Sequence, residues 1–279
     1  MNAPHPILLP DVQSSADTRN LSIQRVGVKG ITVPVRVAGA LGEQATVATV
    51  ELMVGLPPSQ KGTHMSRFLE VLDAHLGPQG VPLSAATLSD LMATMLLRLE
   101  AETGWIELRF PYFIRKRAPV SGVASLMDYR VTLSAERRAG SGATAIVQTI
   151  VAPVTALCPC SKEVAEFGAH NQRAHLTLAV RLDPAAAGAV LDLDAQIRIA
   201  EDAASSELWA VLKRVDEKFV TEHAYQNPRF VEDMVRDVAL RLERDPRALS
   251  YRVEAENFES IHNHSAYALI ESDKLAVRG

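Results

Sequence analysis

The chain has 279 residues, of which 47% are hydrophobic and 22% charged, and its formal net charge is −4. This length exceeds the usual single domain of roughly 100–200 residues, and the composition is that of an ordinary globular protein, so we expect two domains. So small a net charge argues against a broad surface for nucleic acid or for a membrane, and no apolar stretch approaches the ~20 residues that span a bilayer.

The N-terminal segment, residues 1–18, is predicted to be a flexible arm. It lacks the basic and apolar regions of a secretory signal and contains three prolines. We therefore expect a cytoplasmic protein, in which Cys158 and Cys160 remain reduced thiols. Only one residue separates them, so they do not form the C-x-x-C motif of disulfide exchange.

The first half of the chain predicts two strands, two helices and two further strands. Runs of β-branched residues favour strands at 21–37 and 46–54, and similar sequence follows at 105–115 and 124–137. Helical patterns cover 64–76 and 84–102 between them. The second helix has an apolar stripe with helical spacing, formed by Leu88, Leu91, Met92, Met95, Leu96 and Leu99.

The second half predicts the same order of elements. Its expected strands are 143–155, 174–182, 249–258 and 266–271, and its helices are 193–204 and 228–244. Asn227 suits the N-cap and Pro228 the first helical position of the last helix. We expect an α+β fold with antiparallel sheets and helices on one face, divided into domains 19–139 and 140–279.

The densest group of reactive residues lies between two expected strands, at 158–163 and 168–173. Cys160 and His170 supply a thiolate and an imidazole, which bind borderline divalent metals such as Zn, Fe or Mn. On spacing alone, a small buried cysteine and a polar loop histidine are the more common explanation. His262, between the last two strands, is likewise more often a surface residue than a ligand, and 213–223 reads mainly as a solvated helix face.

Five blocks in the same order resemble the prokaryotic type IB GTP cyclohydrolases: GTHMSR at 62–67, LCPCSKE at 157–163, GAHNQR at 168–173, KRVDE at 213–217 and NPRFVED at 227–233. The resemblance covers the chain from about residue 20 to its end. It implies two tunnelling-fold domains, each β-β-α-α-β-β, and a homotetramer with active sites at subunit interfaces. It also implies hydrolysis of GTP to formate and 7,8-dihydroneopterin triphosphate, the first step of folate biosynthesis.

The same resemblance implies the residues of the site. A divalent metal, Mn, Fe or Zn, would be bound by Cys160, His170, Glu217 and His262, with Cys158 as the alternative thiolate. Glu232 would hold the guanine ring, although an ion pair between Glu232 and Arg236 at i, i+4 is the competing explanation. Cys160, His170 and His64 would take part in catalysis, the histidines as proton shuttles.

The triphosphate requires cationic donors. The candidates are Lys61, Arg67 and Lys162, with Arg115 and Lys116 as further choices, and each of them is also compatible with a solvated surface charge. We expect no nucleic-acid or membrane partner.

Two alternatives remain open from the sequence. Another tunnelling-fold enzyme, such as a pterin synthase or nitrile reductase, would share the fold and the purine-anchoring carboxylate without needing the full metal set. A non-catalytic metal- or purine-binding protein would bind ligand without turnover. Metal content distinguishes the first alternative from a GTP cyclohydrolase in part. Turnover of GTP distinguishes the second.

Overall fold

The computed structural model describes residues 11, 13, 15–39, 42–77, 80–182 and 192–274. The expected N-terminal arm therefore lies largely outside the described residues. Within them, the chain forms an α+β fold with an eight-stranded sheet and six helices. In chain order these are β1 (Ile23–Gly39), β2 (Gly42–Leu56), α1 (Met65–Leu76), α2 (Ala85–Leu99), β3 (Gly104–Arg117), β4 (Ala124–Arg137), β5 (Ala145–Leu157), α3 (Pro159–Val164), β6 (Asn171–Leu182), α4 (Leu193–Glu201), α5 (Arg214–Gln226), α6 (Val231–Arg244), β7 (Ala248–Phe258) and β8 (Ser265–Asp273).

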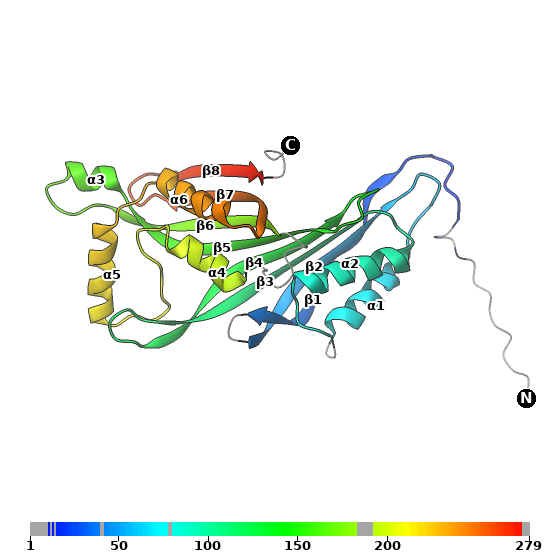
Figure 1. Ribbon diagram of the computed structural model, residues 1–279, viewed down its shortest axis with the longest axis horizontal. Coiled ribbons are helices and arrows are strands. Elements are labelled where there is room, and N and C mark those ends of the chain that lie inside the picture. The colour runs from blue at the N-terminus through cyan, green and yellow to red at the C-terminus, as the bar shows by residue number, and fades with distance from the viewer. Residues whose placement is uncertain are drawn as a thin grey trace, which may run out of the picture.

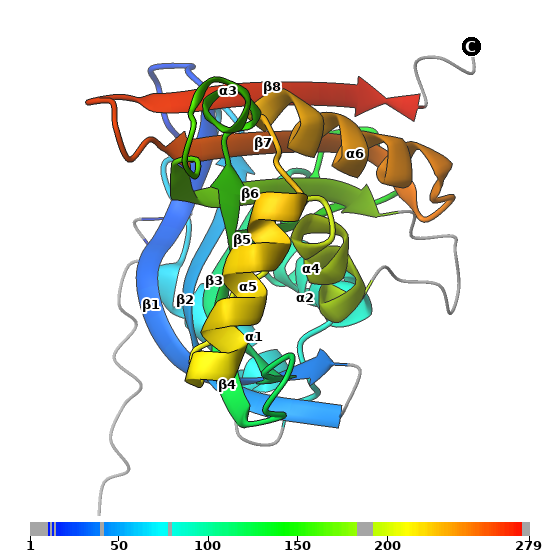
Figure 2. The same ribbon diagram turned by 90° about the vertical axis from the view of Figure 1, so that its left-hand side faces the viewer.

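The eight strands form one continuous sheet in the order of the sequence, and every neighbouring pair is antiparallel. The pairing of β4 with β5, from Arg130↔Val151 to Glu136↔Ala145, joins the two halves of the chain. The sheet is curved; α1, α2, α4 and α6 lie on its concave side, whereas α3 and α5 lie at one end of it (Figures 1 and 2). The expected antiparallel strands with helices on one face are confirmed, whereas the division into two domains near residue 140 stays a prediction.

The element order of the first half is the predicted one. The second half adds α3 and α5 to the predicted series, and α5 falls on the stretch 213–223 that the sequence indicates as a helix face. Local sequence explains the boundaries of α2. Ser84 is its N-cap, because the Ser84 Oγ accepts a hydrogen bond from the Thr87 N–H at 3.2 Å. Glu100 ends the helix in the left-handed conformation, with φ of 53°.

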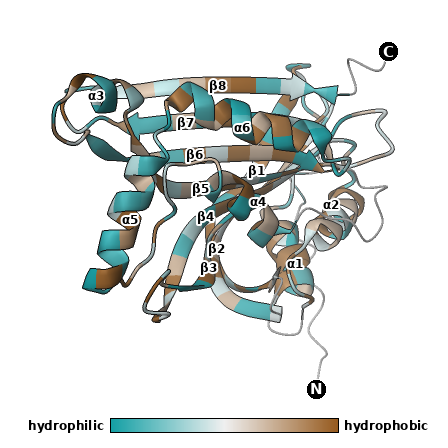
Figure 3. Ribbon diagram, turned by 60° about the vertical axis from the view of Figure 1, so that its left-hand side comes forward, coloured by the Kyte–Doolittle hydropathy of each residue, from teal (hydrophilic) through white to brown (hydrophobic). Residues whose placement is uncertain are grey.

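The core lies between the sheet and the helices and extends through both halves of the chain. The predicted apolar stripe of α2 is buried, and so is that of α6, which presents Val231, Met234, Val235, Val238 and Leu242 to the sheet. Figure 3 shows that α6 also carries hydrophilic residues, as expected of a helix with only one face in the core. Among the described residues, no helix has the length and apolar character needed to cross a membrane.

The predicted start of the last helix is wrong. Helix α6 begins at Val231 with Phe230 as its N-cap, and Asn227 instead ends α5. The Asn227 side chain donates its amide N–H to the Ala204 carbonyl oxygen at 2.9 Å, a contact between segments far apart in sequence. At the start of α6, the Asp233 Oδ2 accepts a hydrogen bond from the Phe230 N–H at 3.0 Å. Asp233 thus supplies the capping contact that was expected from Asn227.

Candidate functional site

Cys158 and His170 lie opposite each other where the β5–β6 ladder ends. The ladder runs as far as Leu157↔Asn171, and the Cys158 N–H donates to the His170 carbonyl oxygen at 3.1 Å, which continues the register by one pair. Directly opposed residues of an antiparallel pair share a face, with Cβ atoms about 4.5–5.5 Å apart. Two positions back, Ala156 and Gln172 are buried, so the thiol and the imidazole lie on the same helix-covered face as the core.

Helix α3 fixes this end of the ladder. Cys158 is its N-cap, and its Sγ accepts the Ser161 N–H at 3.5 Å. The Ser161 hydroxyl donates to the Cys158 carbonyl oxygen and accepts the His170 N–H, both at 3.1 Å. Cys158 is half-buried, whereas Cys160, the predicted ligand, is exposed on α3.

The His170 ring is surrounded by polar groups. Its Nδ1 lies 2.8 Å from the Gln172 Oε1 and 3.9 Å from the Glu259 Oε2. The side chains of His170 and Glu259 are only 14% and 11% exposed. Two polar atoms in this part of the fold, Asn257 Oδ1 and Arg229 Nε, are buried without a hydrogen-bond partner among the described residues. Sequence reasoning missed Glu259, which follows β7 without a recognisable motif.

The other two predicted metal ligands, Glu217 and His262, form no cluster with Cys158 and His170 among the described residues. Glu217 is exposed in the first turn of α5, whereas the last turn of α5 contacts the cysteine block through the Lys162 Nζ, which donates to the Tyr225 carbonyl oxygen at 2.6 Å. Eight helical positions separate Glu217 from Tyr225, or about 12 Å. His262 lies in the exposed turn between β7 and β8, with its ring stacked on that of His264.

In the part of the chain that the structure describes, no group of three or more His, Cys, Asp or Glu residues is placed to hold a metal ion. A thiolate, two imidazoles and a carboxylate nevertheless suit a divalent ion such as Zn, Fe or Mn in their donor chemistry. Of these donor types, the described residues bring together one thiol and one imidazole, those of the opposed Cys158 and His170. The complete ligand set stays a prediction.

The predicted catalytic and phosphate-binding residues of the 62–67 block lie at the other end of the molecule. His64 and Arg67 stand at the start of α1, which Figure 1 places far from α3 and α5. The Arg67 side chain donates to the Arg98 carbonyl oxygen at 3.2 Å, and the His64 Nε2 lies 3.3 Å from the Asp11 Oδ2. An open pocket of about 560 Å³ is lined there by His64, Ser66, Arg67, Glu70, Leu97, Arg98 and Glu100. Lys61, just before this block, is exposed.

Of the remaining candidates for substrate binding, Glu232 and Arg115 are exposed and Lys116 is buried. Glu232 is exposed in the first turn of α6, and no ion pair with Arg236 is found among the described residues, so the competing explanation for Glu232 receives no support. Arg115 is exposed, but Lys116 is buried and cannot reach a triphosphate.

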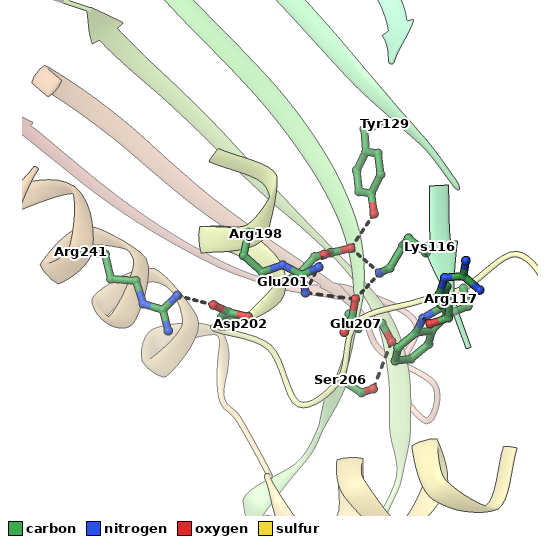
Figure 4. A network of polar contacts seen from close by, with 10 residues as sticks. Lys116, Arg117, Tyr129, Arg198, Glu201, Asp202, Ser206, Glu207 and Arg241 are labelled. Atoms are coloured by element: carbon green, nitrogen blue, oxygen red, sulfur yellow. Dashed lines mark hydrogen bonds and ion pairs between the residues drawn. The ribbon is translucent and has the colours of Figure 1, made fainter. Parts of the chain in front are cut away.

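Lys116 belongs to a buried polar network between β3, β4, α4 and the segment after α4 (Figure 4). Its Nζ lies 2.6 Å from the Glu201 Oε1 and also pairs with Glu207. The Tyr129 hydroxyl donates to the same Glu201 oxygen at 2.5 Å, and burial followed by the charge of Glu201 raises the pKa of Tyr129 far above its usual value. Because these partners lie more than 70 positions apart in sequence, the network ties the two halves of the chain together.

Asp216, next to Glu217, connects α5 to the β3–β4 turn. Its carboxylate accepts hydrogen bonds from the backbone N–H groups of Val120, Ser121 and Lys213 at 2.8–2.9 Å, and from the Ser121 hydroxyl at 2.6 Å. Burial by itself raises the pKa of Asp216, but the hydrogen bonds, led by those from Ser121, outweigh it and place the pKa well below the usual range.

Comparisons with known proteins identify the family. Residues 9–268 match the family model described as type I GTP cyclohydrolase folE2. GTP cyclohydrolase FolE2 1 of Dechloromonas aromatica is 57% identical over 269 residues, covering 96% of this chain and 97% of the relative. GTP cyclohydrolase FolE2 of Burkholderia thailandensis is 57% identical over 276 residues, covering 98% of each.

A solved structure shows the same type of fold. Urate oxidase from Bacillus sp. TB-90 superposes with a TM-score of 0.51 and 10% identity, covering 90% of this chain and 100% of that one. At this identity the likeness concerns the tunnelling fold alone. The family model and the relatives together, each matching nearly the whole chain, show that the chain belongs to the type I GTP cyclohydrolase FolE2 family.

Proposed function

We propose that the protein is a GTP cyclohydrolase of type IB, which hydrolyses GTP to formate and 7,8-dihydroneopterin triphosphate in the first step of folate biosynthesis. The family relationship over nearly the whole chain supports this activity. The observation that links the proposed activity to particular residues is the opposed pair of Cys158 and His170, a thiol and an imidazole on one face of the sheet.

A divalent metal, Mn, Fe or Zn, is part of the proposal. The thiolate of the cysteine block, His170, Glu217 and His262 would hold it. The sequence motif favours Cys160 as the thiolate, whereas the strand register favours Cys158, which shares a face with His170. When bound, the ion supplies a Lewis acid that lowers the pKa of a water molecule toward ~7, so that the water becomes a nucleophile for C8 of guanine.

Glu232 is proposed to anchor the guanine ring. A carboxylate accepts hydrogen bonds from the guanine N1–H and its exocyclic amine, a bidentate match that adenine does not offer. The exposed position of Glu232 leaves its carboxylate accessible to such a ligand. The same contact would bind the substrate and select it against ATP.

A homotetramer with active sites between subunits is also proposed. The Cys158–His170 pair and the His64–Arg67 block lie at opposite ends of one subunit, so both reach the same GTP only if a second subunit supplies one of them. At the α3 end, Phe167 and Val164 are 90% and 84% exposed, and a subunit contact would cover both side chains.

The proposed triphosphate donors are Lys61, Arg67, Arg115 and Lys162, and His64 is a proposed proton shuttle. Reduced thiolates of this kind suit the cytoplasm.

Incubation of the purified protein with GTP and Mn²⁺ or Zn²⁺ tests the activity. We expect release of formate and, after oxidation, the fluorescence of neopterin. ATP under the same conditions should give neither signal. A protein that binds the metal and GTP without releasing formate would instead be a non-catalytic binding protein.

A further inference from the structure

Gln172 lies between His170 and Glu259 and contacts both. Its Oε1 is 2.8 Å from the His170 Nδ1, and its Nε2 is 3.5 Å from the Glu259 Oε1. The Gln172 residue is 6% exposed, so its amide has little access to water and depends on these partners.

The strand register explains why the three residues meet. His170 directly precedes β6, lies two positions before Gln172 and shares the helix-covered face with it. The β6–β7 ladder pairs Ala174 with Asn257, and continuing that register by two positions places Glu259 opposite Gln172. Gln172 lies within β6, whereas His170 and Glu259 directly adjoin the ends of β6 and β7, so the sheet register brings the three side chains together.

The chemistry of the three groups fixes the direction of each hydrogen bond. An ionised carboxylate only accepts, so Gln172 must turn its NH₂ group toward Glu259. Its carbonyl oxygen then faces His170 and can only accept, so the proton of the neutral His170 ring must lie on Nδ1. The second oxygen of Glu259, 3.9 Å from Nδ1, attracts the same proton. The Nε2 atom of His170 is left with its lone pair.

We propose that Gln172 and Glu259 are positioning residues that hold His170 as the Nδ1–H tautomer, with Nε2 prepared as a ligand for a divalent metal. The tautomer follows from the contacts alone, and the role of Nε2 rests on the proposed function. Histidines that bind metals commonly donate the other ring N–H to a carboxylate or carbonyl group, which fixes both ring orientation and basicity.

Long-range ¹H–¹⁵N correlation spectra of the metal-free protein, labelled at its histidines, test the tautomer directly. His170→Gln identifies the His170 signals among those of the eight histidines. We expect the wild-type ring to be protonated on Nδ1. Gln172→Met removes the acceptor at similar volume and should move the proton to Nε2.

Gln148→Met is the matched control. Gln148 is also buried on the helix-covered face of a central strand, at 5% exposed, but its amide donates to the Gln196 Oε1. The control therefore has the same change in a similar environment without contact to His170. Titration with Mn²⁺ and Zn²⁺ against a chromophoric chelator gives the second readout, where we expect about 10- to 100-fold weaker binding for Gln172→Met and unchanged binding for Gln148→Met.

The double variant Gln172→Glu/Glu259→Gln separates positioning from packing. It exchanges the two groups, so that a carboxylate faces Nδ1 and an amide donates to that carboxylate, and it should restore both the tautomer and the metal affinity lost in Gln172→Met. A wild-type ring protonated on Nε2, or a Gln172→Met variant with the wild-type tautomer and metal affinity, would overturn the proposal. A wild-type protein with the Nδ1–H tautomer that binds neither ion would overturn the proposed function and with it the role of Nε2, whereas the control of the tautomer by Gln172 and Glu259 would stand.

Discussion

The Cys158 backbone N–H donates to the carbonyl oxygen of His170 at 3.1 Å, which makes these two residues a directly opposed pair at the end of β5 and β6. Cys160 is two positions further on, in α3, and exposed. The two thiols therefore differ in their relation to the imidazole, although the sequence places them in one motif.

Alanine variants of the two cysteines are expected to differ in metal content. Cys158→Ala should abolish metal binding and GTP turnover, because it removes the thiol on the face of His170, and Cys160→Ala should be milder. Metal analysis and a turnover assay on both variants, with circular dichroism as a check of folding, make the comparison. Loss of metal in Cys160→Ala but not in Cys158→Ala would instead favour the ligand chosen from the sequence motif.

Glu232→Gln is expected to impair turnover without loss of metal. The substitution keeps the shape of the side chain but removes the charge and one acceptor, leaving a guanine N–H poorly paired. Losing a charge-assisted hydrogen bond of this kind costs ~1.5–3 kcal/mol, or roughly 10- to 150-fold in kcat/KM. Glu222→Gln on α5, where Glu222 pairs with Lys218 at 3.7 Å, is a control expected to show wild-type kinetics. Wild-type kinetics in Glu232→Gln would refute the anchoring role.

Lys116→Met is expected to destabilise the fold. It leaves Glu201 and Glu207 without their buried ammonium partner, and breaking a buried ion pair by removing one side costs ~3–5 kcal/mol. Lys218→Met, which removes an exposed pair, should cost no more than ~0.5 kcal/mol. Denaturant unfolding of both variants measures the difference, and equal free energies of unfolding would contradict the structural role of Lys116.

The partly buried position of His175 predicts that the protein loses stability in mild acid. Burial lowers the pKa of His175 below 6.5, the neighbouring Arg130 and Arg173 act in the same direction, and Glu256 opposes them. The unfolded chain therefore binds this proton first as the pH falls below about 6.5, so the free energy of unfolding decreases until the pH passes the folded-state pKa. His175→Gln should flatten this part of the profile. Denaturation midpoints at several pH values between 5 and 8 (about the range in which histidine titrates) measure it, and parallel profiles would exclude the effect.

Local signals in the sequence predicted most elements of the fold. The apolar spacing of Leu88 to Leu99 predicted α2, and the structure confirms that this stripe is buried; the structure adds Ser84 as the N-cap. Asn227 misled the prediction because its amide bonds Ala204, so a tertiary contact overrode a local capping preference. Helix α3 is only six residues long and begins with Pro159, which offers too short a periodic pattern to detect.

The candidate site was predictable only where residues are close in sequence or share a motif. Cys158, Cys160 and His170 lie in two adjacent blocks, whereas Glu259 reaches His170 across β6 and β7 from a position 89 residues further along the chain. The sequence also predicts Lys116 as an accessible cation, which is wrong because its partners, Glu201 and Glu207, are equally remote in sequence. Contacts of this kind are decided by sheet register and by the packing of helices and loops on the sheet, which composition and spacing do not reveal.

Removal and replacement of the metal during GTP turnover tests the account most directly. Formate release by the purified protein is measured after treatment with a chelator and again after addition of Mn²⁺, Fe²⁺ or Zn²⁺. We predict that chelation abolishes turnover and that more than one of these ions restores it, because a mixed thiolate, imidazole and carboxylate site imposes no single geometry strongly. Turnover that resists the chelator, or a protein that releases no formate from GTP with any of the three ions, would contradict the account.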